Sequence, residues 1–172
     1  MNTTLLRDPF GHHVWATLKL LDACAGLRPE QLETSVPGTY GPIIGTMRHL
    51  VGGDTAYLWV ITGGRTRSIE DDEEEHMGLA ELRTLTEANG AAWTALLAED
   101  LDADRIVTRH RDDGTDSQAP LSVRLAQAVH HGTDHRSQVC TALTALGIEP
   151  PDIDVWAFAS EGGRVVVVPT RS

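Results

Sequence analysis

The sequence predicts an all-α protein in which four long helices form a bundle. In four stretches of about 20 residues, apolar residues recur every three or four positions, which is the period of an amphipathic helix. Prolines and glycines punctuate these stretches. The composition, 41% hydrophobic and 23% charged over 172 residues, is typical of one soluble globular domain. We expect the bundle to span about residues 9–158, with a C-terminal extension over 159–172.

The long helices are expected near residues 9–26, 42–62, 79–99 and 120–146. Gly26 follows the first periodic stretch, and Gly147 follows the last. Pro42 and Pro120 stand where the second and fourth helices begin. Proline favours the first turn of a helix and glycine favours the position just after its end, so both ends agree with the periodicity.

Two glycine-containing pairs interrupt the helical pattern. Gly52-Gly53 lies in the middle of the second helix, where each glycine costs about 1 kcal/mol relative to alanine. The pair therefore predicts close packing there, or room kept for another group. Asn89-Gly90 interrupts the apolar pattern of the third helix and is expected to loosen or kink it.

The connections have distinct compositions. Residues 70–75 are six consecutive carboxylates, which repel one another and predict a solvated acidic loop. Residues 104–118 combine a strand-like run with the turn signal Asp113-Gly114, so a small β-ribbon or an irregular excursion is expected before the last long helix. Residues 28–32 predict a turn with, at most, a short helix.

The segment after the last long helix has two parts. Residues 152–158 predict a short helix that packs two aromatic side chains, Trp156 and Phe158, against the bundle. Within the 164–172 tail, Val165 to Val168 is a strand-like run that would promote aggregation if left exposed. We expect this run to pair with a strand of the same chain or of a partner.

Charge and hydropathy exclude several classes of protein. The net charge of −11 argues against nucleic-acid partners and anionic membranes, because both require cationic contacts. No run of 18 apolar residues could span a membrane, and the N-terminus lacks the features of a signal peptide. A cytoplasmic location is therefore expected. Cys24 and Cys140 are too few for a disulfide framework and are expected to be buried free thiols.

The fourth helix carries a candidate metal-binding pair. His131 and His135 are four residues apart and therefore lie on the same helix face, with Gln138 close to that face. Two imidazoles in this arrangement can share one ion. Such a pair can equally be polar surface or interface residues, so a third ligand from another helix is needed to favour metal binding.

The remaining histidines are candidates for that third ligand: His12, His13, His49, His76, His110 and His130. His130 points about 100° away from His131 on the helix and cannot easily share its ion. His49 is attractive because it lies among the apolar residues Met47, Leu50 and Val51. A histidine in that setting is either a hydrogen-bonded core residue or a ligand.

Two motifs give the chain a resemblance to a known family. The stretch 44–51 is similar to the first-histidine segment of the DinB (damage-inducible) superfamily, and 131–138 is similar to its H-x-x-x-H-R-G-Q motif. Ser137 replaces the usual glycine of that motif. Trp15-Ala16 and residues 152–156 also fit the family's layout, so the resemblance covers most of residues 9–158.

The resemblance implies a site and a class of chemistry. It implies that His49, His131 and His135 hold a divalent metal, commonly zinc or nickel, in a protein that is frequently a homodimer. Relatives in the family include thiol S-transferases and a mycothiol-dependent isomerase, so a low-molecular-weight thiol is a candidate metal partner. The side chains that could assist the histidines are Gln138, Asp134, Asp54 and Tyr40. Arg136 is expected to make a structural ion pair.

Two classes of function remain open from the sequence. The first is a metal-dependent enzyme, a hydrolase or a thiol transferase, that acts on a small molecule. Three protein ligands would leave a coordination position for water or substrate, as in catalytic zinc sites. The second is a non-catalytic metal- or ligand-binding stress-response scaffold. An apolar pocket beside the histidines would favour the enzyme.

Overall fold

The computed structural model describes residues 3–168, and these residues are mostly helical. The four long helices are α1 (Arg7–Ala25), α3 (Ile43–Thr62), α5 (Leu79–Leu97) and α6 (Leu121–Ala145). The shorter elements are η1 (Thr3–Leu6), α2 (Pro29–Leu32), α4 (Asp71–His76), β1 (Ile106–His110), β2 (Asp116–Pro120) and α7 (Val155–Glu161). The four predicted long helices are therefore confirmed, and of the two alternatives for the segment before α6 the structure has the β-ribbon.

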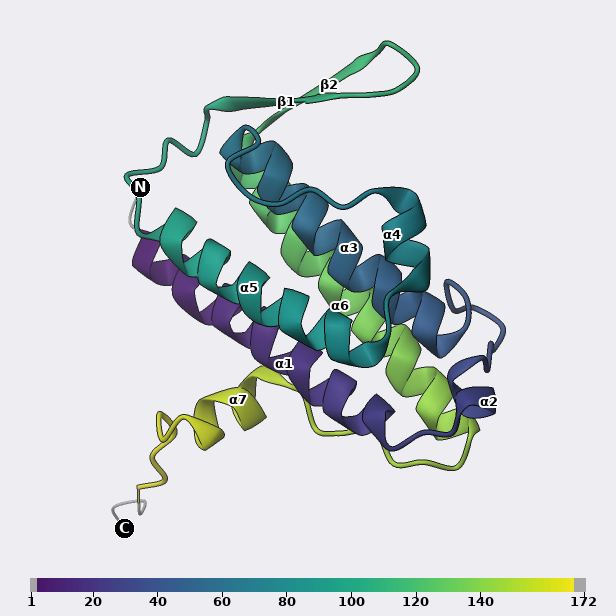
Figure 1. Cartoon of the computed structure of the whole chain (residues 1–172). Coiled ribbons are helices and arrows are strands. Elements are labelled where there is room, and N and C mark those ends of the chain that lie inside the picture. Colours follow the sequence, from purple (N-terminus) through teal and green to yellow (C-terminus); the bar gives the residue numbers. More distant parts are fainter. Residues whose placement is uncertain (1–2, 169–172) are drawn as a thin grey trace.

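The four long helices lie side by side, as Figure 1 shows. Helix α3 packs against α6 and α5, and α1 packs against α5 and α6, so each long helix contacts two of the others. Helix α4 lies against α3, and α7 lies against α1. No helix within residues 3–168 has both the length and the apolar character needed to cross a membrane.

The buried side chains form two apolar clusters with a polar layer between them. One cluster gathers around Leu20, Met47 and Leu143, and the other around Phe10 and Trp93. On every long helix, buried polar residues stand between the residues of the two clusters. They are His13 and Thr17 on α1, Asp54 and Thr55 on α3, Thr86 and Asn89 on α5, and His135 and Arg136 on α6.

The two cysteines are free thiols, as their number in the sequence predicts. Cys24 is fully buried in the cluster around Leu20, whereas Cys140 is half-buried at its edge. Burial raises the pKa of the Cys24 thiol to about 12. This thiol therefore stays protonated at neutral pH and behaves as a small apolar side chain.

The acidic segment is a short helix, α4, and not the loop that its charge predicts. Asp72, Glu73 and Glu75 are exposed, so these carboxylates remain solvated. Glu74 is half-buried, and its carboxylate lies against Gly52 of α3, where a Cβ atom would overlap it. This packing of α4 on a glycine of α3 is a tertiary contact that charge counting along the chain does not register.

Asn89 and Gly90 do not end the third helix, and a local kink there stays a prediction. Helix α5 runs unbroken through both residues. The buried Asn89 amide donates to the Thr55 hydroxyl over 2.9 Å, so its polar group is satisfied. A Cβ atom on Gly90 would lie 2.9 Å from Cγ1 of Val14, so the glycine allows α1 and α5 to approach closely.

The ribbon and the segment after α6 complete the chain. Strands β1 and β2 pair antiparallel, with Ile106 opposite Pro120. In α7, Phe158 packs against Gly11 and the Trp15 ring, but Trp156 is 72% exposed, so only one of the two aromatics packs as predicted. Residues 165–168 form no strand in the described part of the chain. Pairing with a partner stays a prediction, and residues 169–172 of the tail lie outside the described residues.

The position of each leucine relative to the core sets its contribution to stability. Leu143 is fully buried, whereas Leu5 is 78% exposed. We expect Leu143→Ala to lower the free energy of unfolding by about 2–5 kcal/mol, because it removes buried surface and leaves a cavity. Leu5→Ala, the matched control, is expected to change it by about 0.5 kcal/mol or less. Urea unfolding followed by circular dichroism measures both, and equal effects would contradict the packing described.

Candidate metal centre

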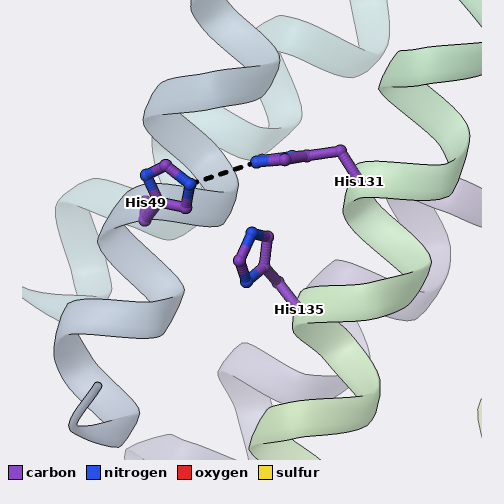
Figure 2. A group of neighbouring side chains, drawn as sticks. All are labelled: His49, His131 and His135. Carbon is purple, nitrogen blue, oxygen red and sulfur yellow. Dashed lines mark hydrogen bonds between the residues drawn. The ribbon is translucent and has the colours of Figure 1, made fainter. Parts of the chain in front are cut away.

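Three histidines from two adjacent helices converge on one point. His49 projects from α3, and His131 and His135 project from α6 (Figure 2). One ligand nitrogen of each lies within 4.8 Å of the others. Nε2 of His49 and Nε2 of His131 are 3.2 Å apart. The spacing of four residues places both α6 imidazoles on the face that α3 covers.

The three rings approach one another edge to face. The ring centroids of His131 and His135 are 4.4 Å apart at 72°, and those of His49 and His135 are 4.7 Å apart at 86°. His135 is 8% exposed, whereas His49 and His131 are half-buried. The nitrogens therefore meet from different directions, with one side towards solvent, and the group could hold a metal ion.

Gly53 gives His131 the room it needs. A Cβ atom at position 53 would lie 2.7 Å from Cε1 of the His131 imidazole, which is closer than side chains pack. Gly52, on the neighbouring side of α3, makes the corresponding room for Glu74. The prediction that this glycine pair marks close packing is confirmed, since one glycine borders the histidine group and the other borders α4.

Gln138 orients one of the histidines. Its amide oxygen lies 3.0 Å from Nδ1 of His135 and also accepts the backbone N–H of Tyr40 over 3.0 Å. Because the oxygen only accepts, Nδ1 of His135 carries the proton and Nε2 keeps its lone pair free. Metal-binding histidines are commonly oriented in this way by a hydrogen bond at the second ring nitrogen.

Two tyrosines flank the histidines. The Tyr40 ring, before α3, stacks on His49 with centroids 4.1 Å apart and an angle of 9°. Tyr57 meets His131 edge-on at 5.4 Å, and its hydroxyl accepts from Gln127 over 3.2 Å. Tyr57 is not among the residues predicted from the sequence. Its spacing of eight residues from His49, about two helical turns, is the signal that could have found it.

Comparison with known proteins identifies the family of the chain. The model of the DinB family matches residues 1–164. The chain belongs to the DinB family. A comparison with curated proteins finds no significant match. The family match spans all the helices that carry the histidines, so the resemblance inferred from the two motifs is confirmed for this DinB protein.

Two candidate helpers of the DinB site are not brought to the histidines. Asp134 is exposed on α6. Asp54 is buried and accepts the indole N–H of Trp93, with both carboxylate oxygens 3.0 Å from that nitrogen. Its carboxylate also lies 3.1 Å from Nε2 of His13. Asp54 thus belongs to the buried polar layer. Its charge acts on the pKa of His131 in the upward direction.

Next to the histidine group, the buried His13 imidazole links the guanidinium of Arg136 to the carboxylate of Asp54. Nη1 of Arg136 lies 3.2 Å from Nδ1 of His13, and it also donates to the His13 carbonyl. A guanidinium only donates, so Nδ1 of His13 accepts and Nε2 carries the proton donated to Asp54. Arg136 has the structural role that was expected, but its direct partner is an imidazole and not a carboxylate. Burial lowers the pKa of Arg136 to about 10, and the charge of Asp54 opposes that shift.

Gly132 couples this link to the histidine group. A Cβ atom at position 132 would overlap the His13 ring and lie 2.8 Å from Nη1 of Arg136. Gly132 follows His131 directly on α6. The rotation of α6 that lets His13 fit against Gly132 is therefore the rotation that presents His131 to α3.

Burial keeps the imidazoles in the form that binds metal. Burial, followed by the nearby His135 and His49, lowers the pKa of His131 from 6.5 to about 4. Burial and His135 also lower the pKa of His49. Both side chains are therefore neutral at pH 7, as a metal ligand must be.

Two cavities of the described residues lie away from the histidines. The larger one, about 590 Å³, is bordered by α4 and α5. The smaller one, about 10 Å³, adjoins His13 and Asp54 in the polar layer. Neither of these two cavities is lined by His49, His131 or His135.

Gly132 is expected to be intolerant of a methyl group. Gly132→Ala should lower the free energy of unfolding by about 1–3 kcal/mol through overpacking against His13, although alanine favours helix by about 1 kcal/mol. Gly45→Ala is the matched control, because a Cβ atom there meets only Cδ of Pro42 at an ordinary 3.5 Å. It should stabilise α3. Thermal unfolding of both variants tests this. A Gly132→Ala variant that is more stable than the parent would show that the close approach of His13 to position 132 is not needed.

Stability of the metal-free protein should fall on acidification. The pKa of His131 is lower in the folded chain than its ordinary value of 6.5, so the unfolded chain binds protons first. The contribution of neutral His131 to the free energy of unfolding is thus fully present above pH 6.5. It is lost progressively between pH 6.5 and about 4. Urea midpoints of chelated protein across this range should decline less steeply in His131→Gln than in the parent. If the urea midpoint of His131→Gln declined with pH as steeply as that of the parent, the lowered pKa of His131 would be contradicted.

Proposed function

We propose that this DinB protein is a metal-dependent enzyme in which His49, His131 and His135 bind one divalent ion, zinc or nickel. The convergence of three imidazole nitrogens within 4.8 Å carries the proposal. The hydrogen bond to Gln138 also leaves a free lone pair on Nε2 of His135, which is the form of the nitrogen that binds a metal ion. Three protein ligands leave at least one position for water or substrate, which distinguishes catalytic from structural zinc sites.

We further propose that α1, α3, α5 and α6 form a four-helix bundle within a single domain, with the bundle spanning about residues 9–158. Each of these helices contacts two of the others, as in such bundles. Metal sites in bundles are built from side chains on facing helices, and α3 and α6 face one another here. The bundle thus supplies a rigid frame for ligands that are 82 residues apart in the sequence.

The proposed reaction is hydrolysis of a small molecule or transfer of a low-molecular-weight thiol to it. A bound ion would supply either an activated water or a site for a thiolate. Gln138 would hold His135 in the binding tautomer, and the stacked Tyr40 ring would restrict the movement of His49. The half-exposed rings of His49 and His131 would leave the open position accessible to substrate.

The setting proposed for this activity follows from charge and family. The net charge of −11 disfavours nucleic acids and anionic membranes as partners. We place the protein in the cytoplasm, as a homodimer like many DinB proteins, and propose that its partner in catalysis is a small-molecule substrate.

One observation favours a second candidate function. The rings of His49 and His131 are half-exposed, whereas small-molecule enzymes usually enclose their substrates. A stress-response scaffold that holds a metal or ligand without turnover would need no such enclosure. The two candidates differ in turnover and not in metal content.

Metal analysis tests the site. The parent is expected to bind one zinc or nickel ion per chain, and alanine at position 49, 131 or 135 should reduce metal content to a small fraction of one. His110→Ala is the control, because this imidazole is exposed on the ribbon and pairs with Asp116. Full metal content in all three ligand variants would overturn the assignment.

Turnover separates the enzyme from the scaffold. Metal-loaded parent should act on an ester panel, or on an electrophile panel supplied with thiols, lose the activity on chelation and regain it when metal is restored. Metal binding with no turnover on either panel favours the scaffold. Activity that survives complete metal removal would refute metal-dependent catalysis.

A further inference from the structure

One cavity lies on the side of the molecule formed by α4 and α5. It has a volume of about 590 Å³, within the range of small-molecule sites in proteins. Its walls come from the segment before α4, from α4 itself and from α5, and we call it the α4–α5 cleft. The family match and the histidine group assign no role to this cleft.

The floor of the cleft is apolar and is kept open by small side chains. Ala80, Thr84, Ala88 and Ala92 line it at intervals of four residues along one face of α5. The apolar base includes Leu85, which is 5% exposed. The cleft therefore has space and apolar surface for the body of a small organic molecule.

Thr84 is the only hydroxyl-bearing residue in this row of four, and its donor is already used. The hydroxyl donates to the Ala80 carbonyl over 3.1 Å, within α5 itself. The side chain therefore offers the cleft its methyl group and an acceptor oxygen, but no free hydrogen. Thr84 thus leaves the floor apolar and adds no hydrogen-bond donor to it.

The floor is tied firmly to the rest of the fold. Asn89 lines the cleft and is 5% exposed, and its amide donates to the hydroxyl of Thr55 on α3. Met77, also at the base, is 6% exposed, and its carbonyl accepts from Arg48 of α3 over 2.8 Å. The α5 floor and the end of α4 are thus both anchored to α3.

The polar groups at the rim mainly accept hydrogen bonds. The guanidinium among the lining residues, that of Arg67, is already paired with Glu73. Nδ1 of His76 lies 2.7 Å from the Asp72 carbonyl, which only accepts, so Nε2 of the neutral ring is an acceptor. Glu81 adds a carboxylate that accepts one backbone N–H, from Gly78. The rim, like the whole chain with its charge of −11, therefore favours a cation.

We propose that the α4–α5 cleft is a second small-molecule site and that its ligand is a small organic amine with an apolar body. The protonated amine would donate to Glu81 and to Nε2 of His76, both at the rim. The apolar body would lie on the α5 floor between Thr84 and Ala88. The proposal does not depend on metal binding by the histidines.

The test uses three probes of similar size and different charge: 2-phenylethylamine, 2-phenylethanol and 3-phenylpropionate. Titrations of the full chain, followed by NMR or calorimetry, should show saturable binding of the amine, with the alcohol and the carboxylate each at least about tenfold weaker. Equal binding of the three probes, or no saturable binding of the amine, would overturn the proposal.

Three variants locate the binding. Ala88→Leu fills the floor from an exposed helix position and should weaken amine binding about tenfold or more, whereas Ala95→Leu, exposed on α5 outside the cleft, should leave it unchanged. Glu81→Gln removes one charge but keeps a capping amide at the start of α5. It should weaken binding up to about fivefold, the usual effect of a partly exposed charge.

Two further measurements distinguish amine binding in the cleft from binding at the metal site and from self-association. His49→Ala should bind the amine as the parent does, so failure of the metal site and failure of the cleft are distinguishable. Sedimentation of the parent and of Ala88→Leu tests whether a second copy of the chain occupies the cleft. A parent dimer that Ala88→Leu converts to monomer would assign the cleft to self-association and overturn the proposal.

Discussion

The arrangement of the histidines depends on the buried link from Arg136 through His13 to Asp54. Arg136 and His13 are each 2% exposed, so their polar atoms have almost no access to water. A buried donor or acceptor left without a partner costs about 1–3 kcal/mol, and more if it is charged. Since the link joins α6, α1 and α3, sliding or rotating any of these helices would leave buried polar groups unpaired. The link therefore specifies how α6 faces α3.

Glycine makes this arrangement sterically possible. Gly132 admits the His13 ring on one side of α6, while Gly53 admits the His131 ring at the surface of α3. Each glycine carries a helix-propensity cost of about 1 kcal/mol, and each lies next to a residue of the polar layer or of the histidine group. The local cost is offset by contacts that a larger residue would exclude. Helix propensity and site geometry are thus in opposition at these two positions.

The sequence predicts the long helices well because each buries an apolar face with a clear period. It predicts the pair His131 and His135 from spacing alone, but His49 needs the family resemblance, since a single histidine in an apolar face is also a common core residue. Helix α4 is not predicted from the local sequence, because its packing depends on the contact of Glu74 with Gly52, which is distant in the chain. Asp54 is a candidate helper because it is close to His49 in sequence, but the helix turns its carboxylate towards Trp93 and His13.

The position of the histidines at mid-height follows from the layering of the core. Apolar clusters lie on both sides of the polar layer on all four long helices, so the helices are held together at both ends by burial of apolar surface. The middle can then carry polar residues without loss of cohesion, provided that they are hydrogen-bonded to one another. His135 belongs to this layer and is held by Gln138, while His49 and His131 extend it to the surface. A metal ion held at this level would be supported by the core on one side and would be open to solvent on the other.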